Sequence, residues 1–236
     1  MPSLTEAATS QVGRKILTGL TGLFLLFFLF FHLAGNLAIF GSADAMNAYS
    51  MKLHNLGWLL WIARIGLLLT FAIHAWIGIS IWLKRRRSRP EGYNVYSSKG
   101  GPSKQSMSSR SMAFTGIVLL VFVIIHVNTF ALGDTETVII DGQEASDLKS
   151  LVIETFQKPI YAFGYAFVMI LLGTHLGHGV WSAFTSLTLK SPSLSNIIYI
   201  TGVVIGILLA VGFLFIPLYI YFTGGCGDLL SGVNCT

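Results

Sequence analysis

Four histidines lie inside long apolar stretches of the sequence, one in each of four successive stretches. An ionisable side chain within a membrane-spanning segment is costly and normally serves a function. Imidazole is also a common ligand of iron, and imidazoles on facing helices of a bundle are the ligand set of a low-spin haem b. The sequence therefore predicts two haem b sites built from four histidines, His32, His74, His126 and His175.

Small residues accompany these histidines, as a flat macrocycle lying between helices requires. Gly78 follows His74 by four residues, and Gly179 follows His175 by four residues. Each glycine is thus expected one turn beyond its histidine on the same helix face. Ala34 and Gly35 are further small residues, beside His32. Ser80 and Ser182 are suited to contact haem propionates.

The composition indicates a membrane protein. Of 236 residues, 53% are hydrophobic and only 11% are charged, whereas soluble domains carry about a quarter charged residues. The apolar runs are continuous and long enough for helices that cross a bilayer, unlike the alternating strands of a β-barrel. The net charge of +5 comes from loops beside the spans and does not indicate nucleic-acid binding. No Cys-x-x-Cys-His motif occurs, which excludes covalent c-type haem.

The sequence predicts an all-α fold, a five-transmembrane-helix bundle that encloses two haems in a single domain. A basic loop, 84–111, and an acidic loop, 133–158, connect successive spans. Helical spacing predicts short surface helices at 43–54 and 145–156. The expected spans are 16–40, 58–83, 112–132, 159–185 and 194–222.

Most basic residues fall on one side of this predicted bundle, and only Lys52, Lys149 and Lys158 fall on the other. Arg14, Lys15, the cluster within 84–110 and Lys190 share the basic side, and most acids lie on the other. The positive-inside rule then places the N-terminus in the cytoplasm and the C-terminus outside the cell membrane.

This orientation assigns a depth to each histidine. At about 1.5 Å per residue, His32 and His126 lie roughly 12 and 9 Å from the outer ends of their spans. His74 and His175 lie about 24 and 22 Å from theirs. The four therefore separate into an outer pair, His32 with His126, and an inner pair, His74 with His175.

Two other histidines need separate interpretations. His178 shares a helical turn with His175 and competes for the ligand role, but the His-x-x-x-Gly spacing favours His175. His178 is left to contact a propionate or a quinone, or to satisfy an ordinary polar group. His54 lies in the outer loop, where a solvated or interfacial histidine is the simpler interpretation.

With these residues in place, the chain resembles a known family: the cytochrome b558 membrane-anchor subunit of succinate:quinone oxidoreductases. This is the single-chain, five-helix, dihaem type found in succinate dehydrogenase and fumarate reductase. The resemblance covers the first four spans and their loops. It is carried by Arg14-Lys15 leading into Gly22, by Phe31-His32-Leu33 and Asn36, by His74-x-x-x-Gly78, by Ile125-His126-Val127, and by His175-Leu-Gly-His-Gly-Val-Trp-Ser-Ala-Phe184.

The resemblance implies a role in respiratory complex II. A flavoprotein subunit with covalent FAD and an iron–sulfur subunit would be the partners, and this chain would pass electrons between the iron–sulfur subunit and a quinone, expected to be menaquinone. The inner haem would be proximal to the iron–sulfur subunit and the outer haem distal. The chain has no dinucleotide fingerprint and no cysteine cluster, so we expect no succinate chemistry in this chain alone.

The quinone site is less sharply indicated. No Asp or Glu lies well inside a span. Arg64, about two turns into the second span, is a candidate quinone contact together with His54, although pairing with a haem propionate is the preferred interpretation of its guanidinium. Other candidates are Asn47 and Tyr49 in the adjoining loop and, near the inner surface, Ser10, Arg14 and Lys15.

Two cysteines occur, Cys226 and Cys235, both in the predicted outer tail. An oxidising compartment would allow them to form a disulfide.

Two rival interpretations remain. A different dihaem cytochrome, b561-like or from another dehydrogenase, would keep the haems and change the partner. A haem-free transporter or anchor would use the histidines as a proton relay, but transporters often contain broken helices, whereas these spans are long and mostly uninterrupted.

Overall fold

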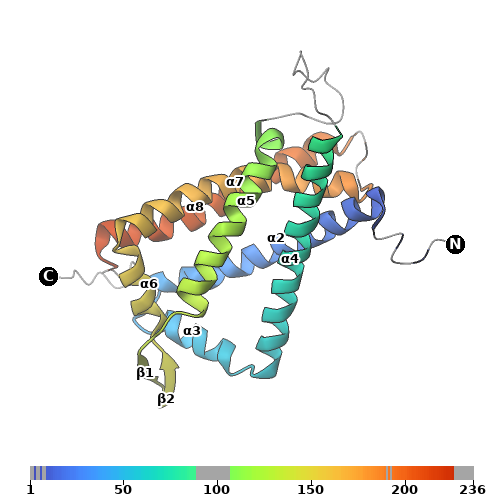
Figure 1. Ribbon diagram of the computed structural model, residues 1–236. Coiled ribbons are helices and arrows are strands. Elements are labelled where there is room, and N and C mark those ends of the chain that lie inside the picture. The colour runs from blue at the N-terminus through green and yellow to red at the C-terminus, as the bar shows by residue number, and fades with distance from the viewer. Residues whose placement is uncertain are drawn as a thin grey trace. The chain divides into compact units, whose positions relative to one another are not determined.

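The computed structural model describes residues 3, 6, 9–88, 107–189, 191 and 193–225, and within them it confirms the predicted all-α polytopic fold. Within the described residues, five helices are long and apolar enough to cross a membrane; Figure 1 shows their arrangement along the chain. They are α2 (Gln11–Asn36, continued by the 3-10 turn η1, Leu37–Phe40), α4 (Trp58–Arg87), α5 (Met107–His126, continued by the π-helical turn η2, Val127–Ala131), α7 (Pro159–Ser186) and α8 (Ser195–Thr223).

Several helices extend about a turn past the apolar stretches that predicted them. α2 begins at Gln11, and α4 continues through Lys84–Arg87. Lysine and arginine are good helix formers, and their positive charge is favourable at the C-terminal end of a helix dipole. α7 begins at Pro159, where a fixed φ and a missing N–H suit the first helical position. α8 contains Pro217 and still continues to its end at Thr223.

The segment between α5 and α7 contains a hairpin that the sequence analysis did not anticipate. β1 (Thr137–Ile140) pairs antiparallel with β2 (Gln143–Ser146) over their full length. Asp141 and Gly142 join them with φ of 50° and 76°, as a two-residue type I′ turn requires. The surface helix expected in this loop is therefore shorter than expected and forms α6 (Leu148–Phe156).

Internal contacts divide the chain into two compact units, and every long helix contributes residues to both. Unit 1 comprises residues 1–27, 67–120 and 171–208. Unit 2 comprises residues 28–66, 121–170 and 209–236.

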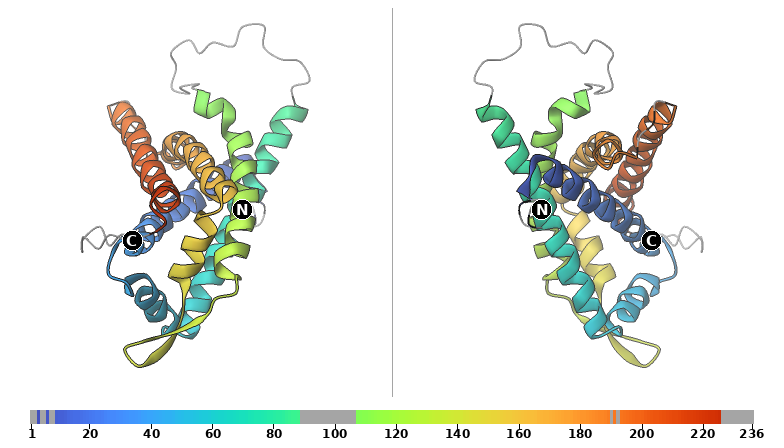
Figure 2. Two further views of the ribbon diagram at one scale, coloured as in Figure 1. Left: turned by 90° about the vertical axis from the view of Figure 1, so that its left-hand side faces the viewer. Right: turned by 90° about the vertical axis from the view of Figure 1, so that its right-hand side faces the viewer.

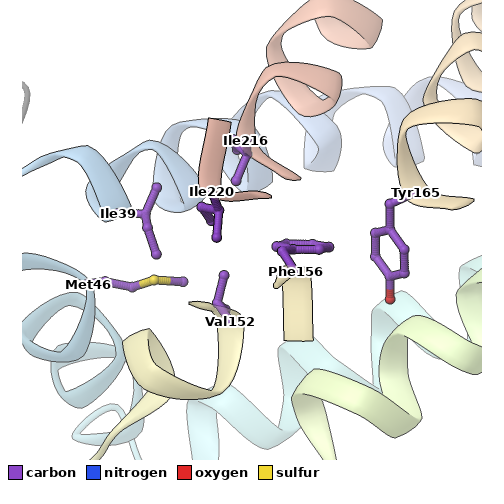
Figure 3. Packing of buried hydrophobic residues seen from close by; sticks show 7 residues of the cluster. All are labelled: Ile39, Met46, Val152, Phe156, Tyr165, Ile216 and Ile220. Atoms are coloured by element: carbon purple, nitrogen blue, oxygen red, sulfur yellow. The ribbon is translucent and has the colours of Figure 1, made fainter. Parts of the chain in front are cut away.

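Unit 2 has a core where the short surface elements meet the long helices (Figure 3). α3 (Ala45–His54), at the position where a short helix was expected, packs against α6 and β2 (Figures 1 and 2). The buried Asn47 side chain joins α3 to α6, because its amide donates to Asp147 Oδ1 at 2.8 Å and its oxygen accepts from the Lys149 backbone at 2.9 Å. The buried core residues are Ile39, Met46, Val152, Phe156, Tyr165, Ile216 and Ile220.

In unit 1, α7 and α8 approach each other through glycines (Figure 1). A Cβ atom on Gly206 would lie 2.6 Å from the carbonyl oxygen of Gly173, and one on Gly202 would lie 3.2 Å from that of Gly177. Small residues at this spacing are typical of close helix packing in membranes. Gly173 and Gly177 flank His175 in the sequence, so α8 supports the segment of α7 that carries this histidine.

Candidate functional site

Unit 2 brings His32 of α2 beside His126 of α5. Their ring centroids are 5.6 Å apart and their planes are nearly perpendicular. Two metal–imidazole bonds of about 2 Å on opposite sides of one ion place ring centroids about 6 Å apart. The two rings are therefore already close to the separation of two ligands of a single metal.

Aromatic rings surround this pair. Phe28 stacks on His32 at 5.1 Å and Phe122 stacks on His126 at 5.7 Å, each from four residues earlier on the same helix. Such rings keep water from the imidazoles, and the buried Nδ1 of His126 has no hydrogen-bond partner among the described residues. Further rings within contact of the pair belong to Phe130, Tyr165 and Phe213.

The helix geometry changes immediately after His126. Residues Val127–Ala131 form a π-helical turn. Single π turns are rare and occur frequently at functional sites.

Unit 1 contains the other two histidines, each in contact with a threonine of a neighbouring helix. His74 Nδ1 on α4 lies 3.2 Å from Thr21 Oγ1 on α2. His175 Nδ1 on α7 lies 3.0 Å from Thr115 Oγ1 on α5. Both imidazoles belong to unit 1. Four of the five long helices thus supply residues to this site.

A glycine follows each of these threonines and allows the helix to approach the imidazole. A Cβ atom on Gly22 would lie 3.1 Å from His74 Cε1, and one on Gly116 would lie 3.5 Å from His175 Cε1. By contrast, Cβ atoms on Gly78 and Gly179 would meet no atom within 4 Å. The two motif glycines therefore leave open space beside their helices, as a bound macrocycle requires.

The threonine–glycine pairs are not among the predicted site residues, although the sequence contains a signal for them. Thr21-Gly22 precedes His32 and Thr115-Gly116 precedes His126, with eleven residues from threonine to histidine in both cases. A phenylalanine lies four residues before each of these histidines. Eleven residues are close to three helical turns, so the threonine and the histidine share a face. The first and third spans repeat this pattern, as the second and fourth repeat His-x-x-x-Gly.

The remaining predicted site residues take other positions. Arg64 is exposed, and its guanidinium lies 5.4 Å from the centroid of the Trp61 ring. His54 is exposed, with Nδ1 3.0 Å from the Ser50 carbonyl oxygen. Both contacts are made within a single helix, and neither brings its side chain to a histidine pair.

On α7, two further predicted residues lie near His175 in the sequence. His178 and Ser182 are half-buried. The Nδ1 atom of His178 is buried and has no hydrogen-bond partner within the described part of the chain, whereas Nδ1 of His175 has one. The structure therefore separates the two competing histidines by their surroundings.

Two other residues singled out in the sequence have structural explanations. The expected role of Gly35 was to admit the macrocycle, but a Cβ atom there would lie 2.7 Å from the Tyr49 ring, so Gly35 accommodates Tyr49. Asn47 uses its side chain in the link between α3 and α6 described above, which argues against a quinone contact. Cys226 and Cys235 lie outside the described residues.

Comparisons of the chain with protein-family models, with curated proteins and with solved structures gave no match. Among the described residues, no three or more His, Cys, Asp or Glu side chains form a group able to hold a metal ion. The histidines occur instead as two pairs, and a pair of imidazoles suits an iron whose other ligands come from a macrocycle.

Proposed function

We propose that this chain is a dihaem cytochrome b that anchors a succinate:quinone oxidoreductase in the membrane. His32 and His126 would hold one haem b, and His74 and His175 would hold the other. The observation that carries this proposal is the placement of one histidine pair, drawn from two different helices, in each compact unit. The assignment to succinate:quinone oxidoreductase rests on the sequence resemblance.

The residues at both pairs fit this cofactor. The outer ring centroids lie 5.6 Å apart, near the spacing of two imidazoles that would bind one iron, and Cβ atoms on Gly78 and Gly179, four residues after the inner histidines, would meet no atom within 4 Å. When bound, haem b supplies one-electron oxidation and reduction. The chain's own residues bind the iron through imidazole, exclude water with apolar and aromatic side chains, and fix the ring orientations through helix packing.

The arrangement of charge supports a role between a soluble partner and a quinone. The exposed cations Lys84–Arg87 form the last turn of α4. The positive-inside rule assigns this end of the helix to the cytoplasm. An iron–sulfur subunit docked on that side, with its flavoprotein subunit, would lie nearest the inner pair. Electrons would then pass by the outer pair to or from a quinone, expected to be menaquinone.

The test is a reduced-minus-oxidised absorption spectrum of the detergent-purified chain, with extracted haem counted per protein. We expect two b haems per chain. One haem would mean that one pair is misassigned, and a folded sample without haem would overturn the proposal in favour of a haem-free anchor or transporter.

A second measurement addresses the partner. Gentle purification from the native membrane should recover a flavoprotein with covalent FAD and an iron–sulfur protein. Two haems with a different partner would instead identify a cytochrome of another dehydrogenase or a b561-like protein.

A further inference from the structure

The inner histidines are held by equivalent contacts. In both, Nδ1 faces a threonine hydroxyl from a neighbouring helix, at 3.2 Å for His74 and 3.0 Å for His175. A hydroxyl both donates and accepts, and a neutral imidazole carries its hydrogen on only one nitrogen. The position of the hydroxyl hydrogen therefore decides which imidazole nitrogen is protonated.

Backbone carbonyl groups accept hydrogen bonds from both threonine hydroxyls. Thr21 Oγ1 lies 2.7 Å from the Leu17 carbonyl oxygen, and Thr115 Oγ1 lies 3.1 Å from that of Ser111. Carbonyl oxygens only accept hydrogen bonds. Each hydroxyl thus donates to the preceding turn of its own helix, and its oxygen is left to accept from the imidazole.

Other helical threonines of this chain use their hydroxyls in the same way. Thr18 donates to the Arg14 carbonyl and Thr185 to the Trp181 carbonyl, both at 2.8 Å. The carbonyl oxygen of Thr18 also lies 3.2 Å from Thr21 Oγ1, as a second acceptor for that hydroxyl hydrogen. With its hydrogen engaged by these carbonyls, the Thr21 oxygen is left to accept, which favours a hydrogen on Nδ1 of His74.

We infer that Thr21 and Thr115 are positioning residues that fix His74 and His175 as the Nδ1–H tautomer and leave Nε2 with the free lone pair. Gly22 and Gly116 allow each hydroxyl to reach its ring. The inference rests on the proposed function for the identity of the ligand, the iron of haem b. Hydrogen bonds of this kind orient a ligating histidine and increase its basicity.

The outer pair lacks an equivalent contact at one member. Nδ1 of His126 is buried and has no partner within the described residues. The threonine–glycine contacts therefore distinguish the inner haem site from the outer one, and their removal should affect one haem only.

The experiment compares Thr21→Val and Thr115→Val, which remove the hydroxyl at nearly constant shape, with Thr21→Ser and Thr115→Ser, which keep it. Thr185→Val, a back-bonded threonine of α7, is the matched control. Midpoint potentials and the ferric electron paramagnetic resonance signals of both haems are measured on the full-length haem-loaded chain. Loss of the hydrogen bond makes imidazole a weaker donor to ferric iron, so we expect one potential to rise and one signal to shift in each valine variant.

The serine variants and Thr185→Val should match the wild type. The inference is overturned if the valine variants hold two haems with unchanged potentials and signals, or if serine and valine act alike. Wild-type protein without haem would instead overturn the proposed function. In that sample ¹⁵N shifts of the His74 and His175 rings still report the tautomer, and an Nε2–H tautomer at both would overturn the inference separately.

Discussion

At the scale of single residues, the hydrogen-bond partners of the Nδ1 atoms distinguish His175 from His178, the other candidate for the ligand role on α7. His175 Nδ1 contacts a hydroxyl, whereas the buried Nδ1 of His178 has no partner in the described structure. A ligating histidine usually donates its second nitrogen to an acceptor. The surroundings of His175 therefore match those of His74, the other proposed inner ligand, and those of His178 do not.

This difference predicts the effect of replacing each histidine with leucine. If the proposed haem sites are correct, His175→Leu should reduce the haem content from two per chain to one, because it removes a proposed iron ligand. His178→Leu should keep both haems and cost little stability, because it removes a buried polar atom that has no partner. Haem extraction with protein quantification checks both variants. Loss of haem in His178→Leu alone would transfer the ligand role to His178.

The open space at Gly179 gives a second residue-scale prediction. Gly179→Leu should weaken retention of the inner haem, by about 10-fold or more if ligand geometry is disturbed, because the side chain enters the space proposed for the macrocycle. Gly164→Leu is the control, since a Cβ atom there also meets nothing within 4 Å and it lies in unit 2. Haem loss during dialysis against apomyoglobin measures retention. Equal retention in the two variants would contradict this placement of the haem.

At the scale of elements, the role of α8 is to pack against α7. It carries no histidine, and its Gly202 and Gly206 bring its backbone against Gly173 and Gly177. The fifth helix thus acts on the site indirectly, by fixing the position of the helix segment around His175.

A substitution within this contact should therefore affect both stability and haem content. Gly206→Val should destabilise the protein by at least about 1–3 kcal/mol, because the added atoms meet backbone that cannot move aside cheaply. Thermal unfolding in detergent and the haem count check this. Gly164→Val, with free space at its Cβ, should be close to neutral in both measurements. An unfolding temperature for Gly206→Val equal to that of the control would argue against the α7–α8 contact.

The contact between α3 and α6 is pH-dependent through Asp147, the N-terminal cap of α6. Burial raises the pKa of this carboxyl, but hydrogen bonds from Ser150 and Asn47 and the nearby Lys149 charge outweigh it and hold the pKa below its ordinary value of 3.8. The charged form is thus favoured in the folded protein. Its stabilising effect is complete above pH 3.8 and is lost as pH falls through the lowered folded-state pKa.

We therefore expect Asp147→Ala to cost about 1 kcal/mol at pH 7. The difference from the wild type should shrink as the pH falls below 3.8. Hydrogen exchange of the α6 amides at several pH values measures this locally. A cost that does not change with pH would show that the carboxylate charge has no part in the contact.

At the scale of the whole molecule, the charge distribution predicts the direction of insertion. In a Cys226→Ser/Cys235→Ser background, Ser88→Cys should react with a membrane-impermeant maleimide only from the cytoplasmic face. Glu144→Cys, on the exposed strand β2, should react only from outside. The cysteine-free parent is the control. Reversed labelling would show that the chain has the opposite orientation, and it would place the docking side of a soluble partner on the other face of the membrane.

The membrane class, the five spans and the two histidine-bearing repeats can all be predicted from the amino-acid sequence. These features are local, because about 20 consecutive apolar residues are enough to define a span, and Pro159 marks a helix start without help from distant residues. Even the Asp141-Gly142 turn, which sequence analysis overlooked, is a local signal. Positions of histidines along their helices followed from the helical rise alone.

Which side chains come into contact follows from the packing of the helices and cannot be predicted from the sequence pattern. Thr21 reaches His74 and Asn47 reaches Asp147 across long stretches of chain, and Gly35 faces Tyr49 where a cofactor was expected. These contacts depend on the rotation of each helix about its axis and on how closely its neighbour approaches. Hydropathy does not encode that rotation, because lipid accepts any apolar face. Small residues and single hydrogen bonds set it, and their partners are known only once the helices are packed together.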